Sequence, residues 1–346
     1  MSGAKRRRVD RVEVKLEPSE VSTGGGNVVS RYFTSRKQGC DVKQEEDSVI
    51  DFEYVKSLSS GEYFDRMESL TSDDPMLWRQ PLSETILSKL YSRSEIVPRN
   101  FIPIFTQVRE MRSHMVTPVD KMGCPRIPVL VSKQFGIERD QIRPIDYRLQ
   151  LLISLILASQ TKDETVTKAM YNIMNYCITE FKDSHGITLK SLSLIPVGIL
   201  ENLIKSTGFY HRKAIYIKQT VLQLQETFDG DVPQDIKGMI SLSGVGPKIG
   251  YLALQKSWGL IDGICVDVHV DRLCRLWGWV PSSLSLSGTR NNAEETRIAI
   301  EKWLPRELWY DFNTILVGFG QMVCGPKIRR CDLCLANQVC PASQVK

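Results

Sequence analysis

The sequence has neither an apolar run long enough to cross a membrane nor a secretory signal. Its longest apolar stretch, Leu149 to Ala158, is interrupted by Gln150 and Ser154, so we expect a buried helix there rather than a membrane span. Without a signal peptide, the cysteines are expected to stay reduced. Strand-like alternation and internal repeats are also missing, and the remaining apolar pattern is helical. The sequence therefore predicts a helical protein without a membrane partner.

The composition is ordinary for a soluble globular protein, with 42% hydrophobic and 25% charged residues. The 346 residues are enough for one large hydrophobic core or two modest ones. A net charge of +5 is weak evidence for an anionic partner, because many soluble proteins carry such a charge.

Residues 1–46 have few bulky apolar side chains, and we predict that they are disordered. The basic cluster Lys5 to Arg8 resembles a nuclear-import signal; the alternative is a charge run that keeps the tail soluble. We expect a nuclear location, with the mitochondrion as an additional one. A mitochondrial presequence is disfavoured by Asp10, Glu13 and Glu17, because such peptides lack acidic residues.

Three short patterns in this tail are weaker. Lys15 and Lys43 each lie in an apolar-Lys-x-Glu pattern typical of sumoylation acceptors, which arises often by chance. Residues 29–33 faintly resemble a peptide that binds a sliding clamp, but the leading Gln is missing. Residues 47–100 carry scattered aromatic side chains, and the sequence assigns no role to them.

From residue 101 onward the pattern is densely helical. Thr161 and Glu164 are spaced as a capping box and predict the start of a helix. Apolar residues from Ala214 to Phe228 recur at helical spacing and are expected in the core. We predict a proline-containing connector through Pro118 and Pro128 and a loop over 281–292. The other predicted helices span 101–114, 147–158, 294–303 and 307–319.

Four of the nine cysteines form one short pattern near the end of the chain, Cys324-x6-Cys331-x2-Cys334-x5-Cys340. A cubane iron–sulfur cluster needs one thiolate per iron, and a loop with this spacing can supply all four. A structural zinc site is the first alternative, although zinc ribbons usually pair two Cys-x2-Cys elements and only one occurs here. Two disulfides are the second alternative and do not suit a reducing compartment. The spacing favours the cluster. The other cysteines are expected in the core or tail: Cys40, Cys124, Cys177, Cys265 and Cys274.

A glycine-containing turn, Gly244-Val245-Gly246, lies between two helical segments and is followed by Pro247. Proline suits the first position of a helix, where its missing N–H costs nothing. Backbone amides at such a turn and helix start can bind a phosphate. This is the layout of a helix-hairpin-helix, which holds nucleic-acid backbone without reading bases. The alternative is an interhelical turn without a ligand.

Lys248 falls in the first turn of the helix that this hairpin begins. The positive end of the helix dipole disfavours a protonated lysine there, and a neutral lysine is a nucleophile. The alternative is a lysine that binds phosphate as a cation.

Asp267 lies in the apolar run 264–270, where an unpaired charge is costly. It can be a helix N-cap, assist a lysine nucleophile, or do both.

Together these motifs resemble the endonuclease III family, the iron–sulfur branch of the helix-hairpin-helix DNA glycosylases, and most closely its eukaryotic members. The resemblance rests on four elements in order: residues 159–163 (Ser-Gln-Thr-Lys-Asp), 244–248 (Gly-Val-Gly-Pro-Lys), 266–270 (Val-Asp-Val-His-Val) and the cysteine pattern. Residues 305–309 and 318–321 also fit, and the resemblance covers residues 101–342.

The resemblance implies an all-α, two-lobed helix-hairpin-helix glycosylase fold with a C-terminal iron–sulfur loop. One lobe, a six-helix barrel, would span 147–261, and the lobe with the [4Fe-4S] cluster would combine 101–146 with 262–346. Double-stranded DNA that contains oxidised pyrimidines or abasic sites would lie between the lobes. A monomeric enzyme is expected.

The resemblance also implies a mechanism. Lys248 would attack C1′ of the damaged nucleotide to form a Schiff base, Asp267 would assist it, and β-elimination would cut the strand. Gln160 would fill the space that the lesion leaves; the alternative is a polar residue in a loop. Further DNA contacts are expected from Gly244, Gly246, Lys327, Arg329 and Arg330; the alternative for the last three is a solvated basic loop.

Three positions depart from the family pattern. Ser243 replaces a usual proline, Gly250 replaces a usual alanine and is expected to loosen helix packing, and Val268 replaces a usual threonine beside Asp267. None removes a catalytic group.

Two rival functions are considered. One is a monofunctional adenine glycosylase, which lacks the lysine at 248 and continues with a domain after Pro341. The other is a non-enzymatic iron–sulfur DNA-binding protein. Lys248 argues against the first, and Lys248 with Asp267 argues against the second.

Overall fold

A computed structural model of the chain describes residues 50–70, 75–281 and 292–345, which belong to one compact unit from Asp47 to Lys346. Within these ranges the regular structure is helical, and the single β-bridge joins Cys324 and Arg329. The predicted all-helical fold is confirmed. None of the described helices is both long enough and apolar enough to span a bilayer. The sequence patterns of the tail, and residues 282–291 of the loop predicted over 281–292, lie outside the described residues.

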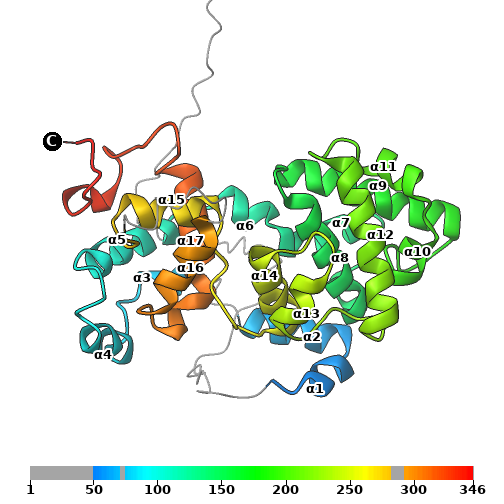
Figure 1. Ribbon diagram of the computed structural model, residues 1–346, viewed down its shortest axis with the longest axis horizontal. Coiled ribbons are helices and arrows are strands. Elements are labelled where there is room, and N and C mark those ends of the chain that lie inside the picture. The colour runs from blue at the N-terminus through cyan, green and yellow to red at the C-terminus, as the bar shows by residue number, and fades with distance from the viewer. Residues whose placement is uncertain (1–49, 71–74, 282–291, 346) are drawn as a thin grey trace, which may run out of the picture. The chain divides into compact units, whose positions relative to one another are not determined.

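The first hydrophobic core surrounds α8 (Pro144–Ala158), in which every side chain from Asp146 to Leu157 is buried. Pro144 begins this helix at a position where no amide is needed. Helices α7 and α14 pack against α8, as do α9 and α12 (Figure 1). From residue 127 onward, the helices of this core are α7 (Ile127–Lys133), α8, α9 (Asp163–Phe181), α10 (Leu189–Leu194), α11 (Val197–Ile204), α12 (Tyr210–Thr227), α13 (Ile236–Ser241) and α14 (Pro247–Trp258).

The second hydrophobic core is rich in aromatic side chains. Phe101 lies at its centre, with ring centroids 5.1 Å from Phe105, 4.9 Å from Trp279 and 4.8 Å from Trp303. Its helices are α3 (Pro75–Arg79), α4 (Glu84–Ser92), α5 (Phe101–Ser113), α15 (Val268–Leu276), α16 (Asn292–Glu301) and α17 (Trp309–Met322), with α6 (Pro118–Met122) against α17. Short 3-10 turns complete the described chain: η1 (Cys124–Arg126), η2 (Arg139–Gln141), η4 (Arg306–Leu308) and η5 (Leu335–Gln338).

The segment to which the sequence assigned no role contributes to both cores. Helices α1 (Phe52–Ser57) and α2 (Ser60–Ser69) bring Val55 and Tyr63 into the first core. The Tyr63 hydroxyl donates to the carbonyl of Ser257 at 2.7 Å, which ties α2 to α14. Helix α2, drawn in blue in Figure 1, packs against α14. Trp78 and Leu90 lie in the second core. Helices α1 to α4 therefore belong to the two hydrophobic cores.

Several local expectations need correction. The capping box is wrong: α9 begins at Asp163 with Lys162 as N-cap, and the Thr161 hydroxyl is engaged elsewhere. The predicted helix 147–158 begins three residues earlier, at Pro144. The connector contains the helices α6 and α7. Ile127 and Val131, which lie in the stretch that the resemblance assigns to the cluster lobe, are buried in the first core, where α7 packs on α8 and α9.

A fragment that begins at Asn100 is expected to lose most of its stability, whereas one that begins at Asp47 is expected to fold. The shorter fragment lacks Tyr63 and Phe64 from the first core and Trp78 and Leu90 from the second. Removing each such side chain costs about 2–5 kcal/mol, which together exceeds the usual stability of a domain. Thermal unfolding of both fragments measures the difference. Equal melting temperatures would show that residues 50–99 are not needed for either core.

Candidate active site and cysteine loop

The glycine turn and the two helices around it form a helix-hairpin-helix. Asp235 caps α13, with its carboxylate accepting from the amide of Gly238 at 2.9 Å. Helix α14 begins at Pro247 with Gly246 as N-cap. Gly244 has φ +80°, and a Cβ there would lie 2.7 Å from the ring of Tyr216. The turn therefore needs glycine at 244 for both its backbone conformation and its contact with α12.

Helix α12 also holds the hairpin by hydrogen bonds. The Thr220 hydroxyl donates to the Ser243 carbonyl at 3.0 Å, and the Ser243 amide donates to Gln223 Oε1 at 3.0 Å. A proline at 243 has no amide to donate, so Ser243 provides a hydrogen bond that the usual family residue cannot make.

Gly250 does not loosen the packing of the hairpin, contrary to the sequence-based expectation. A Cβ at this position would lie 2.7 Å from Ile236 Cδ1 and 3.3 Å from Met239 Cβ. Helices α13 and α14 thus approach each other closely at Gly250, and the missing methyl group is what makes the approach feasible.

Lys248 and Asp267 meet although nineteen positions separate them in the sequence. Lys248 is the second residue of α14, and its Nζ lies 3.9 Å from Asp267 Oδ2. Asp267 is the N-cap of α15, as the sequence predicted: its Oδ1 accepts from the amides of His269 and Val270 at 2.8 and 2.9 Å. The Lys248 side chain is 53% exposed and the Asp267 side chain 10%. One carboxylate oxygen thus serves the helix and the other faces an accessible amine.

Burial disfavours the charged forms of two side chains beside this pair, Cys265 and His269. Burial raises the pKa of the Cys265 thiol to about 12, and its Sγ lies 3.6 Å from the Lys248 carbonyl. Burial also lowers the pKa of His269, although Asp267 acts in the opposite direction. Val268, next to Asp267, is 75% exposed and adds an apolar group to the surface.

Gln160 and Phe209 are exposed on two turns that touch each other. Both have left-handed backbones, with φ 52° and 57°, and Phe209 is 59% exposed at the N-cap of α12. Gly208 approaches the Gln160 turn so closely that a Cβ would lie 3.1 Å from the Gln160 carbonyl oxygen. The sequence analysis missed Phe209. The available signal was an aromatic residue after a glycine, directly before a helix.

The four cysteines of the C-terminal loop surround one small cavity, which Trp277 and Phe319 also line. The loop folds back on itself through hydrogen bonds from Arg330 N to Val323 O at 2.9 Å and from Gly325 N to Ile328 O at 3.0 Å. Burial raises the pKa of Cys324, and that of Cys334 to about 11. Across the described ranges, no three His, Cys, Asp or Glu side chains form a group that could hold a metal ion.

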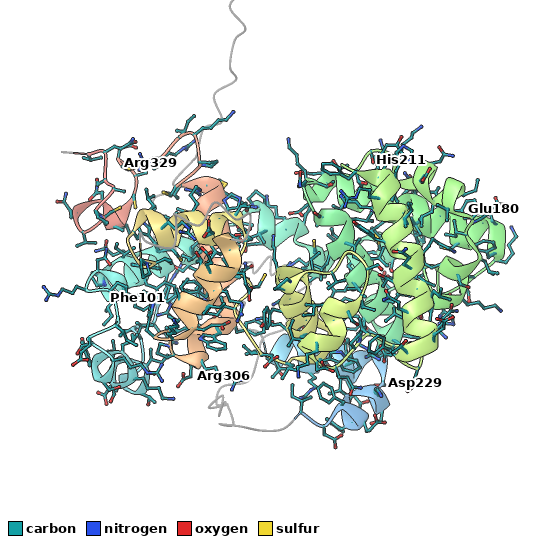
Figure 2. All side chains as sticks on the ribbon, viewed as in Figure 1. Phe101, Glu180, His211, Asp229, Arg306 and Arg329 are labelled. Atoms are coloured by element: carbon teal, nitrogen blue, oxygen red, sulfur yellow. The ribbon has the colours of Figure 1, made fainter. Side chains whose placement is uncertain are left out.

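The basic residues of this loop differ in what they contact. Lys327 is exposed. Arg329, labelled in Figure 2, donates to the Ala342 carbonyl at 3.2 Å, and both Arg329 and Arg330 are half-buried beside the cavity. Lys327 is therefore accessible to a partner, whereas the hydrogen bond of Arg329 helps to hold the loop together.

Comparison with known proteins identifies the family. Residues 153–306 match the model of the HhH-GPD superfamily of base excision DNA repair proteins. Endonuclease III homolog 2 of Saccharomyces cerevisiae is 44% identical over 98% of this chain and 88% of its own length. The chain belongs to the endonuclease III family. Endonuclease III-like protein 1 of Gallus gallus is 36% identical over 71% of this chain and 79% of its own length.

Solved structures also align with the chain. A trapped endonuclease III–DNA covalent intermediate has a TM-score of 0.48 and 23% identity, covering 66% of this chain and 97% of its own. A non-covalent endonuclease III–DNA complex has a TM-score of 0.47 and 24% identity, covering 66% and 97%.

As a member of the endonuclease III family, the protein is a base excision repair enzyme, a DNA glycosylase with AP lyase activity. The rival of a non-enzymatic DNA-binding protein is thereby set aside. Residues 153–306 include the hairpin, Lys248 and Asp267.

Gly244→Ala is expected to lower the melting temperature clearly, and Gly246→Ala only slightly. A side chain at 244 needs a left-handed backbone and meets the Tyr216 ring, which together cost about 1–3 kcal/mol, whereas a Cβ at 246 meets no atom within 4 Å. Thermal unfolding of the two variants measures this contrast. Equal losses, or a larger loss for Gly246→Ala, would contradict the described turn.

Proposed function

We propose that the protein removes oxidised pyrimidines from double-stranded DNA and then cuts the strand at the abasic site, with Lys248 as nucleophile. The observation that carries the proposal is the position of Lys248: its amine is accessible, at the start of a hairpin helix, 3.9 Å from the one oxygen of Asp267 that the helix cap does not use. An amine and a carboxylate in this arrangement fit nucleophilic attack with proton transfer.

The first step proposed is attack of the neutral Lys248 amine on C1′, which breaks the bond to the damaged base. Asp267 takes up the proton of the attacking amine and, as an anion, stabilises positive charge that develops on the sugar. The base leaves with the electron pair of the glycosidic bond and is protonated. Ring opening then breaks the C1′–O4′ bond: Asp267 passes its proton to O4′, and the nitrogen lone pair forms an iminium ion between Lys248 and C1′.

The second step proposed is β-elimination. A proton leaves C2′ of the iminium ion, and the phosphate on C3′ departs with its bonding electrons, which cuts the strand on the 3′ side of the lesion. Water then hydrolyses the conjugated imine and frees Lys248. The iminium ion makes the C2′ proton acidic, so the lysine contributes to both activities.

For substrate binding we propose that the amides at Gly244 and Gly246 hold a phosphate at the hairpin, and that Lys327 contacts a second one. The lesion must leave the base stack, which costs about a few kcal/mol and least for a damaged base. Gln160 would fill the vacated space. Phe209 has a large exposed ring on the neighbouring turn and would stack against a base there.

We propose that Cys324, Cys331, Cys334 and Cys340 hold a [4Fe-4S] cluster. The type of donor supports the proposal, because four free thiols line one small cavity and each iron of a cubane takes one thiolate; the thiols would have to move closer together on binding, since the described side chains do not form a metal-holding group as they lie. When bound, such a cluster would serve as a cross-link between four points of the loop. The thiols would lose their protons on binding, and the exposed Lys327 would be held in a fixed position.

We also propose that Lys5 to Arg8, which lie outside the described residues, direct nuclear import. We propose further that the protein acts as a monomer. A contact between residues 29–33 and a sliding clamp is a weaker proposal, because that segment lacks the leading Gln.

Borohydride is expected to trap a covalent complex between the protein and abasic DNA, and Lys248→Gln is expected to abolish it. The reason is that only the Lys248 imine can be reduced to a stable link. Lys237→Gln is the matched control, because Lys237 is an exposed lysine on the other helix of the same hairpin. Trapping at the wild-type rate by Lys248→Gln would move the nucleophile to another residue.

The purified protein is expected to contain about four irons per chain, as a cubane with four thiolate ligands requires. Cys331→Ser should lower the iron content and weaken DNA binding, because the loop loses a ligand. Cys274→Ala, at a buried cysteine outside the loop, should keep its iron. Colourless, active protein with stoichiometric zinc would contradict the cluster.

A further inference from the structure

Lys213 is a buried lysine that the proposed mechanism does not use. It lies in the second turn of α12 and is 4% exposed. Its Nζ donates to the carbonyls of Leu157 and Ser159 at 2.7 Å each and to the Thr161 hydroxyl at 2.8 Å. Leu157 is in the last turn of α8 and Ser159 is its C-cap. The amine therefore lies at the negative end of that helix, where a cation is favourable.

These three contacts suit the charged form of the amine. An ammonium group has three donors and no acceptor, and here each donor has one acceptor. A neutral amine would have one donor fewer and a lone pair facing an oxygen. Burial lowers the pKa of Lys213 to about 8, so the group remains mostly protonated at neutral pH.

Thr161 extends this contact to the turn that carries Phe209. Its hydroxyl oxygen also accepts from the amide of Gly208 at 3.2 Å. Lys213 and Thr161 thus connect the Gln160 turn with the Phe209 turn. Gln160 and Phe209 both have left-handed backbones, a conformation that a non-glycine residue keeps only where its surroundings hold it.

We propose that Lys213 is a positioning residue that holds Gln160 and Phe209 in the arrangement needed to displace the lesion from the duplex. This rests on the proposed function of those two side chains. Lys213 touches neither the lesion nor Lys248; it acts through the two turns. Its removal therefore affects substrates whose lesion must leave a base stack, and spares those in which the reacting sugar is already accessible.

Helix α12 offers a matched control in Lys218. Its Nζ also donates to carbonyls, those of Leu192 at 3.0 Å and Ser193 at 2.7 Å. These carbonyls belong to the last turn of α10, away from both turns. Lys218→Met thus removes a similar lysine contact from the same helix without touching the Gln160 turn.

The test compares Lys213→Met and Lys218→Met on two substrates in the full-length protein. One is a duplex with a thymine glycol, on which single-turnover excision is measured. The other is a single-stranded oligonucleotide with one abasic site, on which borohydride trapping is measured. We expect Lys213→Met to slow excision about tenfold or more, the scale of loss for a misplaced group near a reaction, with trapping within about twofold of wild type. Lys218→Met should change both rates by the same factor.

Thr161→Val is the second variant. It keeps Lys213 and the shape of the side chain, removes the shared hydroxyl, and should give the same selective loss. If Lys213→Met does not fold, Thr161→Val alone tests the positioning role. Equal loss on both substrates, or normal excision by Thr161→Val, would overturn the positioning role. Failure of the proposed function is distinguishable, because the wild type itself would then neither excise thymine glycol nor form the trapped complex.

Discussion

The active site depends on how the two oxygens of Asp267 are divided. Oδ1 caps α15 through two backbone amides, and this fixes the carboxylate at the start of the helix. Oδ2 is left facing Lys248 at 3.9 Å. A buried carboxylate is costly without hydrogen bonds, so the cap is what permits a charged group to remain in the apolar run from 264 to 270. The same two hydrogen bonds also set the direction in which the Asp267 carboxylate points.

Helix α12 is the element that connects the rest of the site. At its beginning it presents Phe209 and, through Lys213, contacts the Gln160 turn. Two turns later Thr220 and Gln223 hold the hairpin at Ser243. The elements proposed to grip the phosphate and to replace the lesion are thus fixed by one helix, which can keep their distance constant.

The sequence was sufficient for the helical class, the hairpin and the Asp267 cap, because each follows from local chemistry: Pro after a Gly turn, and a carboxylate directly before a helix. Sequence patterns did not predict the features that depend on tertiary contacts. Thr161 and Glu164 fit a capping box, but Lys213 and Gly208 take the threonine hydroxyl instead. Gly250 was expected to loosen packing, but the structure places Ile236 and Met239 close enough that a Cβ at 250 would force them to shift. Trp78 and Tyr63 gave no periodic signal, since they lie in short helices whose partners are far away in the sequence.

The double role of Asp267 is tested most directly by Asp267→Ser, with thermal unfolding and the rate of imine trapping on abasic DNA measured on the same preparation. Serine is a good N-cap and has no charge, so we expect a nearly unchanged melting temperature and a trapping rate lower by a factor of ten or more, because a proton acceptor is lost. Asp267→Ala should lower both the melting temperature and the trapping rate, because removal of the cap costs about 1 kcal/mol of stability. A normal trapping rate for Asp267→Ser would show that the carboxylate serves only the helix, and would contradict the account.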